Sequence, residues 1–137
     1  MKRLLATSLG LAAVLCGAPL HALEFWHSNT VWAGQGQCAA VFSFDSDLQD
    51  VSELHLDVTG FNTAGETILS GELQIDQFGQ SSADRYAEAY LESEALCGED
   101  LIIQVEQASA RLNGKPTDLL STRTLIVRDF KPLKIQL

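Results

Sequence analysis

The chain of 137 residues carries a formal net charge of -9 and is long enough for one domain with a core of its own. The acidic excess argues against nucleic acid or an anionic membrane as the partner, because both repel a negatively charged surface. It is typical of a soluble protein and also suits a basic protein partner.

Residues 1–22 have the organisation of a secretory signal peptide. A short basic start precedes an apolar run at residues 4–15, which is too short to span a bilayer, and Ala22 offers a small residue for cleavage. We therefore expect one domain over residues 23–137 and a periplasmic or secreted protein. The alternative is a lipoprotein anchored through Cys16, although the residue before it is larger than lipoprotein processing prefers.

Residues 23–30, which follow the expected cleavage point, are interpreted as a mobile linker. They include Trp26, which is expected to be either a contact residue or disordered. We expect Trp32 in the core, with an interface as the alternative, because tryptophan buries much area at little entropic cost. Trp26 and Trp32 are therefore the candidate partner-binding residues of the chain.

Residues 34–39, GQGQCA, match the pattern G-x-G-x-x-A of dinucleotide-binding loops, and Asp57 lies near the distance where a ribose ligand would be sought. Such a site needs a buried strand before the loop and a helix after it. Here the residues after Ala39 alternate as in a strand, so no helix N-terminus would hold the phosphates. We expect no cofactor and interpret Gly34 and Gly36 as the flexible approach to a strand.

Strand-like alternation dominates the rest of the chain. Residues 52–61 place leucine and valine on one face and polar side chains, including His55, on the other, which is typical of a half-buried strand. Residues 67–76 continue this alternation around a candidate bulge at Gly71.

Residues 81–96 fit two structures. Their alanine and glutamate content favours a helix intrinsically, whereas their alternation and the surrounding strands favour a strand from about Arg85 onward. We predict the strand, preceded by a helical turn at residues 81–84 and followed by an irregularity before Cys97. In this position Tyr86 is expected to be a corner tyrosine, whose hydroxyl ties a loop to the next strand.

The C-terminal part of the chain carries a hairpin signal. Asn113 and Gly114 both tolerate positive φ and predict a two-residue turn, with residues 119–130 as the return strand. Residues 133–137 then close the chain as a last strand. About seven short strands joined by turns, with few helix signals, predict an all-β fold, an antiparallel β-sandwich.

Two cysteines, Cys38 and Cys97, remain after removal of the signal peptide. In an oxidising compartment such a pair is most simply a disulfide, which we expect to clamp the two layers of the sandwich. Two buried free thiols are the alternative. A metal pair is disfavoured, because no other cysteine or histidine lies near either one at ligand spacing.

No combination of side chains predicts catalysis. His55 lacks a serine or cysteine nucleophile in a recognisable motif, and the carboxylates Glu92 and Glu94, which share a predicted strand face, are expected by chance in so acidic a chain. Asp45 and Asp47 loosely resemble a calcium loop but lack its glycine at position six and its glutamate at position twelve. We predict a polar turn there, no metal site and no catalytic residue.

Three strings carry a resemblance to a known family: NTVWAGQGQCAAVFSFDS, DQFGQSSADRYAEAYLESEALC and DFKPLKIQL. Over about residues 28–137 the chain resembles the family of interleukin receptor mimic protein A. The resemblance implies a fibronectin type III-like sandwich, a domain-swapped homodimer that binds interleukins, and a family disulfide at Cys38 and Cys97. Strand exchange needs a hinge that prefers extension, and the candidate hinge residues are Phe78, Gly79, Gln80 and Ser81.

These observations lead to two functional hypotheses. The first is a non-enzymatic secreted or periplasmic binding module that resembles a cytokine receptor mimic, acts in immune modulation and virulence, and contacts its partner through loops and sheet edges. The second is an inhibitor or assembly factor of the cell envelope that binds a bacterial protein through a sheet edge. We expect neither nucleic acid nor a membrane as the partner.

Overall fold

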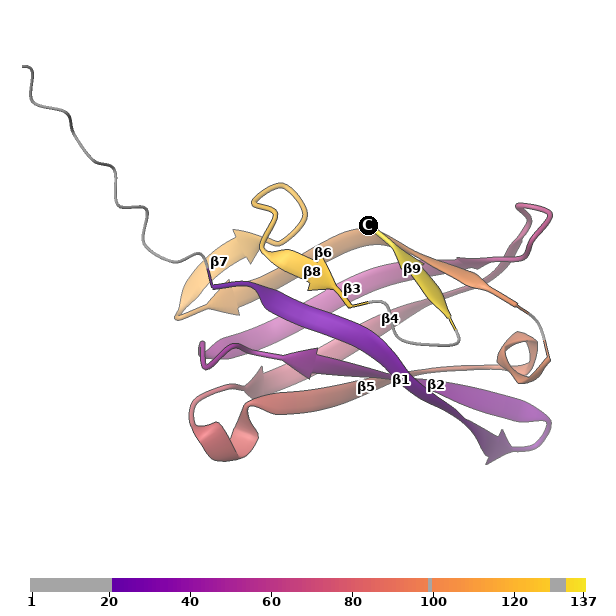
Figure 1. Cartoon of the computed structure of the whole chain (residues 1–137), viewed down its shortest axis with the longest axis horizontal. Helices are drawn as coiled ribbons and strands as arrows, with labels where there is room; N and C mark the ends of the chain where they lie inside the picture. Colours follow the sequence, from indigo (N-terminus) through magenta and orange to yellow (C-terminus); the bar gives the residue numbers. More distant parts are fainter. Residues whose placement is uncertain (1–20, 99, 129–132) are drawn as a thin grey trace, which may run out of the picture.

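The computed structural model describes residues 21–98, 100–128 and 133–137. They form nine strands and two short 3-10 helices, and the strands make two sheets that pack face to face (Figure 1). No helix in the described ranges is long and apolar enough to cross a membrane. The predicted signal peptide falls almost entirely outside these ranges.

The first sheet has the strand order β5-β2-β1-β8, with the bounds Tyr86–Ser93, Gln37–Asp45, Leu23–Gly34 and Leu125–Val127. The second sheet has the order β4-β3-β6-β7, with the bounds Thr67–Phe78, Val51–Phe61, Ile102–Leu112 and Lys115–Asp118. A ninth strand, β9, covers Lys134–Gln136 and pairs with β6. The chain therefore passes from one sheet to the other after β2, β4, β5, β7 and β8.

The predicted antiparallel sandwich is confirmed, and it carries two parallel additions. The pairings among β1 to β7 are antiparallel, whereas β8 lies parallel to β1 and β9 lies parallel to β6. Both additions are only 3 residues long. They raise the number of strands above the seven that were expected, without changing the two-layer architecture.

The core lies between the sheets and is built from the inward positions of the alternating strands. Phe25 of β1 stacks on Phe44 of β2 with ring centroids 5.3 Å apart, and Phe42 is completely buried in the same sheet. From the second sheet, Leu56 of β3 and Ile103 of β6 are also completely buried. The leucine and valine face predicted for β3 therefore points inward, as expected.

Residues 23–30 are not a linker, because they form most of β1. Leu23, Phe25 and His27 are all completely buried, so the strand contributes three successive inward positions to the core. A register shift between His27 and Asn29 then interrupts the alternation. This irregularity and the buried histidine hide the strand from a search for alternating apolar residues.

Residues 81–96 adopt the predicted helical turn and strand. The short helix η1, Ser82–Asp84, is capped at its start, where the backbone N–H of Ser81 donates to Asp84 Oδ1 at 2.7 Å. The strand β5 follows and pairs with β2 along its whole length. A second short helix, η2 at Glu94–Cys97, is the irregularity expected before Cys97. Pairing with β2 thus outweighs the helix propensity of this segment.

The predicted hairpin turn is confirmed, but its return strand is shorter than expected. Asn113 and Gly114 have φ values of 51° and 80°, and β7 follows them directly. Asp118 ends β7, because its Oδ1 accepts a hydrogen bond from the backbone N–H of Leu120 at 3.1 Å and starts a turn. The described part of residues 119–130 therefore forms this turn and then β8 of the other sheet.

The bulge predicted at Gly71 is wrong. The strands β3 and β4 stay in register there, and their irregularity lies instead between Gly60 and Phe61. Gly71 serves a different purpose, because a Cβ at this position would lie 2.8 Å from Cδ2 of Leu91 in β5. The missing side chain lets the edges of the two sheets approach each other.

Candidate protein-binding surface

The outward face of the first sheet gathers aromatic and apolar side chains from four strands. Facing residues of an antiparallel pair point to the same side of a sheet, so Val41 of β2 stands between Asn29 of β1 and Tyr90 of β5. Trp26 and Tyr86 lie further along the same side. We call this surface the aromatic face and define it by Trp26, Val31, Val41, Tyr86, Tyr90 and Ile126.

Two arginines hold the aromatic rings at one end of this face. Trp26 and Tyr86 form an edge-to-face pair with ring centroids 6.4 Å apart. The guanidinium carbon of Arg128 lies 4.9 Å from the Trp26 ring centroid, and that of Arg85 lies 5.4 Å from the Tyr86 ring centroid. Such aromatic and cation–π contacts are worth about 0.5–1.5 kcal/mol each, so the two rings are held in place in the single chain.

Asp45 anchors both arginines beneath the rings. Its side chain is only 3% exposed and accepts two hydrogen bonds from Arg85, to Oδ1 at 2.8 Å and to Oδ2 at 3.1 Å. Arg128 lies 3.6 Å from Oδ2, and the backbone N–H of Asp47 donates to Oδ1 at 2.9 Å. Burial alone would raise the pKa of Asp45, but these hydrogen bonds and the two positive charges hold it below its ordinary value.

Replacing the main partner of this carboxylate is expected to destabilise the fold in a pH-dependent way. Because the folded-state pKa of Asp45 lies below the unfolded value of 3.8, its ion pair stabilises the fold above that pH and loses this contribution as the pH falls through the folded-state pKa. We expect Arg85→Ala to lower the free energy of unfolding by about 2 kcal/mol near pH 7, with a smaller loss near pH 2.5. Urea unfolding at the two pH values measures both quantities.

The matched control is Arg111→Ala, which removes an exposed ion pair with Glu53 at 3.9 Å. We expect it to cost no more than about 0.5 kcal/mol at either pH. Equal losses for Arg85→Ala at neutral and acidic pH contradict the assignment of the effect to the charge of Asp45.

Trp32 lies apart from the aromatic face and is not a core residue. Its side chain is 73% exposed. Trp32 lies near the C-terminal end of β1, where it pairs with Cys38 of β2. Figure 1 shows the end of this hairpin diverging from the second sheet, which agrees with the exposure of Trp32. The expectation of a buried Trp32 is therefore wrong, and the two candidate partner-binding tryptophans occupy different parts of the first sheet.

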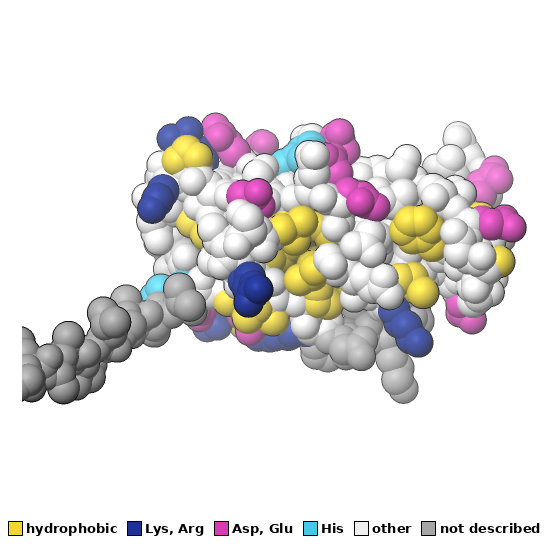
Figure 2. Space-filling model, turned by 90° about the horizontal axis from the view of Figure 1, so that it is seen from above, with side chains coloured by type: hydrophobic (Ala, Val, Ile, Leu, Met, Phe, Trp, Pro, Cys, Tyr) yellow, Lys and Arg dark blue, Asp and Glu magenta, His cyan; other side chains and the backbone are white. Residues whose placement is uncertain are grey.

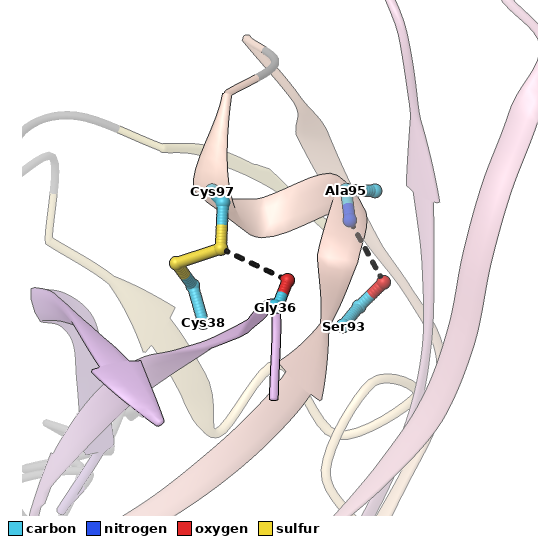
Figure 3. The surroundings of a disulfide bond; sticks show 5 residues. All are labelled: Gly36, Cys38, Ser93, Ala95 and Cys97. Atoms are coloured by element: carbon cyan, nitrogen blue, oxygen red, sulfur yellow. Dashed lines mark hydrogen bonds between the residues drawn. A yellow bond between two sulfur atoms is a disulfide. The ribbon is translucent and has the colours of Figure 1, made fainter. Parts of the chain in front are cut away.

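The disulfide between Cys38 and Cys97 is present, with a Cα–Cα distance of 5.1 Å. It joins the start of β2 to the end of η2, which follows the neighbouring strand β5 (Figure 3). The bridge therefore fastens one end of the first sheet and does not clamp the two layers together. Cys97 Sγ also lies 3.7 Å from the carbonyl oxygen of Gly36, a contact and not a hydrogen bond, because a bridged sulfur carries no hydrogen.

The glycines of the GQGQCA string form the turn between β1 and β2. Gly34, Gln35 and Gly36 have φ values of 91°, 53° and 75°. Positive φ is where glycine meets no steric penalty, which explains both glycines. The turn leads directly into β2 and not into a helix, so the interpretation as an approach to the strand of Cys38 is correct.

The candidate hinge connects β4 of the second sheet to η1. Phe78 is buried, and Gly79 has a φ of 88° and donates its backbone N–H to the carbonyl of Asp84 at 2.8 Å. A Cβ at Gly79 would lie 1.9 Å from the carbonyl oxygen of Gln49. In the single chain, the segment is thus folded back against the connection between β2 and β3. Its use as a hinge stays a prediction.

The structure also decides the roles predicted for one tyrosine and for two pairs of carboxylates. Tyr86 is 59% exposed and its hydroxyl bonds to none of the described residues, so it is not a corner tyrosine. Glu92 belongs to β5 whereas Glu94 begins η2, so these carboxylates do not share a strand face. Asp47 lies in the predicted polar turn, while Asp45 is the buried partner of the arginines.

Comparisons with known proteins agree with this architecture. A family model described as interleukin receptor mimic protein A matches residues 23–127. The solved structure of IrmA from Escherichia coli is similar, with a TM-score of 0.65 and 24% sequence identity, over 85% of this chain and 98% of that chain. At this identity the structural likeness concerns the fold alone. No curated protein matches the chain.

Proposed function

Because this chain belongs to the family of interleukin receptor mimic protein A, we propose that it is an exported, non-enzymatic binding protein whose partner is a host protein of the interleukin kind. We propose further that the partner binds on the aromatic face. The observation that carries this assignment is the exposure of two tyrosines on a sheet surface, since Tyr86 is 59% and Tyr90 is 54% exposed.

The composition of the aromatic face supports a protein partner. Tyrosine, tryptophan and arginine are the residue types enriched at the energetic centres of protein interfaces. Trp26 and Tyr86 are already held by Arg128 and Arg85, so little side-chain freedom remains to be lost on binding. Val31 and Ile126 add exposed apolar surface, at 43% and 44% exposure.

The charge around the aromatic face favours a basic partner. Glu88 and Glu92 alternate with the tyrosines along β5 and point to the same side. The positive charges of Arg85 and Arg128 are offset by two carboxylates, because Asp45 pairs with both arginines and Glu24 pairs with Arg128. A carboxylate-lined surface on a chain of net charge -9 attracts a positively charged surface and speeds its association at low salt.

Alanine substitution on the aromatic face tests this proposal. We expect the purified, oxidised protein to retain a host interleukin from a panel in surface plasmon resonance. Tyr86→Ala and Tyr90→Ala are each expected to weaken that binding by roughly tenfold or more, because truncation of a central aromatic costs about 1–2 kcal/mol. Trp32→Ala in the same assay decides whether the end of the hairpin takes part.

The matched control is Leu137→Ala, which truncates an apolar side chain of 51% exposure that follows β9 of the second sheet. It is expected to leave the affinity unchanged. Retention of no interleukin removes the partner class, whereas retention that both tyrosine variants leave intact removes the aromatic face as its site.

Export and self-association complete the proposal. The disulfide fits an oxidising compartment, and we propose that residues 1–22 are removed when the chain reaches it. We also propose a homodimer formed by exchange of strands about the hinge Phe78, Gly79, Gln80 and Ser81, since this segment connects the two sheets. A light-scattering mass of one chain at micromolar concentration contradicts the dimer.

The free edges of the sheets favour a second candidate function. Among the described strands, β8 pairs only with β1 and β7 pairs only with β6, so each leaves one edge unpaired. An unpaired edge can accept an extended segment of a bacterial envelope protein. Capture of a periplasmic protein, with no interleukin retained, favours this function over the first.

A further inference from the structure

Three side chains able to bind a metal converge on the outward face of the second sheet. His55 and Asp57 are two residues apart on β3 and therefore point to the same side, and Glu72 of β4 pairs directly with Asp57. One ligand atom from each of the three lies within 4.8 Å of the others. His55 and Asp57 are half-buried and Glu72 is exposed, so an ion can reach the group from solvent.

A fourth residue orients the imidazole. Nε2 of His55 lies 2.9 Å from Asp57 Oδ1, and Nδ1 lies 3.2 Å from the side-chain amide of Gln74. The same amide donates to Glu72 Oε2 at 3.0 Å. Metal-binding histidines are commonly held in this way, with a polar group on the ring nitrogen that does not face the ion.

The two carboxylates lack a positive partner within the protein. Among the described residues, no lysine or arginine forms an ion pair with Asp57 or Glu72, and the only charge partner of Asp57 is His55. This contrasts with Asp45 of the first sheet, whose charge is balanced by two arginines. Figure 2 shows acidic side chains gathered beside a histidine at one border of the molecule.

The strand that carries the group is locally distorted on both sides of it. The pairing of β3 with β6 shifts register between Ser52 and His55 and again between Asp57 and Val58. Glu53, inside the first irregularity, has a φ of 51°. Bulges bend a strand and re-aim its side chains, so His55 and Asp57 occupy a short segment whose direction differs from that of a regular strand.

We propose that His55, Asp57 and Glu72 bind one divalent first-row transition-metal ion, for which Zn²⁺ is the reference. One imidazole nitrogen and two carboxylate oxygens are a three-ligand set that Zn²⁺ accepts at about 2.0–2.2 Å, with water in the remaining position. The nitrogen ligand disfavours Mg²⁺ and Ca²⁺, which prefer oxygen alone. This site is separate from the aromatic face and from partner binding.

The imidazole binds the ion in its neutral form. Nε2 coordinates the metal, and the ring proton resides on Nδ1. The side-chain amide of Gln74 rotates by about 180°, so that its oxygen accepts a hydrogen bond from Nδ1–H. Asp57 and Glu72 release their hydrogen bonds to His55 and Gln74 and direct one oxygen each to the ion. Gln74 is thus a positioning residue and not a ligand.

Titration of Zn²⁺ into the purified, oxidised protein at about pH 7.5, followed by calorimetry, tests the site. We expect one ion per chain, and a loss of affinity of roughly tenfold or more for His55→Ala and for Glu72→Gln. Gln74→Ala is expected to weaken binding while leaving the stoichiometry unchanged. Glu66→Gln, which removes an exposed carboxylate from the turn between β3 and β4, is the matched control and is expected to bind as the parent does.

Nuclear magnetic resonance of the His55 ring separates a built site from general attraction of cations to an acidic protein. Saturating Zn²⁺ is expected to move the Nε2 resonance of His55 and to place the ring proton on Nδ1, whereas excess Mg²⁺ is expected to do neither. Zn²⁺ binding that survives His55→Ala unchanged, or the absence of binding at micromolar Zn²⁺, overturns the proposal. Because the aromatic face lies on the other sheet, interleukin binding is expected to be the same with and without Zn²⁺.

Discussion

Gly79→Ala is expected to lower the free energy of unfolding by at least about 3 kcal/mol. The backbone there has a φ of 88°, a region that alanine adopts only with strain. The new Cβ would also lie 1.9 Å from the carbonyl oxygen of Gln49 and 2.6 Å from Cβ of Ser46. Both neighbours belong to the connection between β2 and β3, so relief requires movement of the backbone. Urea unfolding followed by tryptophan fluorescence measures the loss.

Gly98→Ala is the matched control for this substitution. Gly98 has no positive φ, and a Cβ at that position would meet no atom within 4 Å. We expect the free energy of unfolding of the Gly98→Ala variant to stay within about 0.5 kcal/mol of that of the parent protein. If Gly79→Ala lowers the free energy of unfolding by less than about 1 kcal/mol, the backbone between β2 and β3 can move at little cost. That result contradicts the tight packing of Gly79 against Gln49 and Ser46.

Removal of the disulfide is expected to have an effect of similar size. The bridge closes a loop with a sequence separation of 59 residues, and the chain-entropy relation gives about 4 kcal/mol for a loop of this length. The double variant Cys38→Ser and Cys97→Ser should therefore lose a large share of the stability of a domain, which is about 5–15 kcal/mol. We expect the folded fraction to keep its strands, because the bridge fastens one end of the first sheet and not the core between the layers.

The reduced parent protein is the control for the disulfide prediction. Urea unfolding of the parent in excess reductant should give the same midpoint as the double variant, and the variant should not respond to reductant. A difference of less than about 1 kcal/mol between oxidised and reduced parent indicates that the native bridge adds strain that cancels its entropic benefit.

Much of the second sheet could be predicted from the sequence, because its strands bury one face and expose the other. Period-two alternation places Leu54 and Leu56 inward on β3, and the pair Asn113 and Gly114 marks the turn after β6. In the first sheet, by contrast, the strand β5 could be chosen over a helix only from its context, since its own residues favour a helix. Local patterns therefore suffice where a strand is regular.

The first sheet was harder to predict, because its irregularities and its hairpin end follow from tertiary structure. The register shift after His27 conceals β1, and Trp32 near the end of the hairpin is exposed. The parallel entry of β8 beside β1 has no local signal. In the second sheet, the short length of β7 was equally hard to predict, because it depends on the turn that Asp118 starts.

The aromatic face could be predicted only in part. Tyr86 and Tyr90 are four residues apart in a predicted strand, so their common face follows from the alternation. The contact between Trp26 and Tyr86 depends on β2 lying between β1 and β5, an order that no single segment encodes. Arg128 reaches Trp26 from the far end of the chain, and Asp45 looked like part of a surface turn.

Mapping of the contact surface tests most directly the claim that the aromatic face binds the partner. The experiment is cross-saturation nuclear magnetic resonance of the isotope-labelled protein in complex with the retained interleukin. We expect saturation to reach the outward residues of β1, β2 and β5, strongest at Tyr86 and Tyr90. Saturation confined to the outward face of β3, β4 and β6, with none at these tyrosines, contradicts the account.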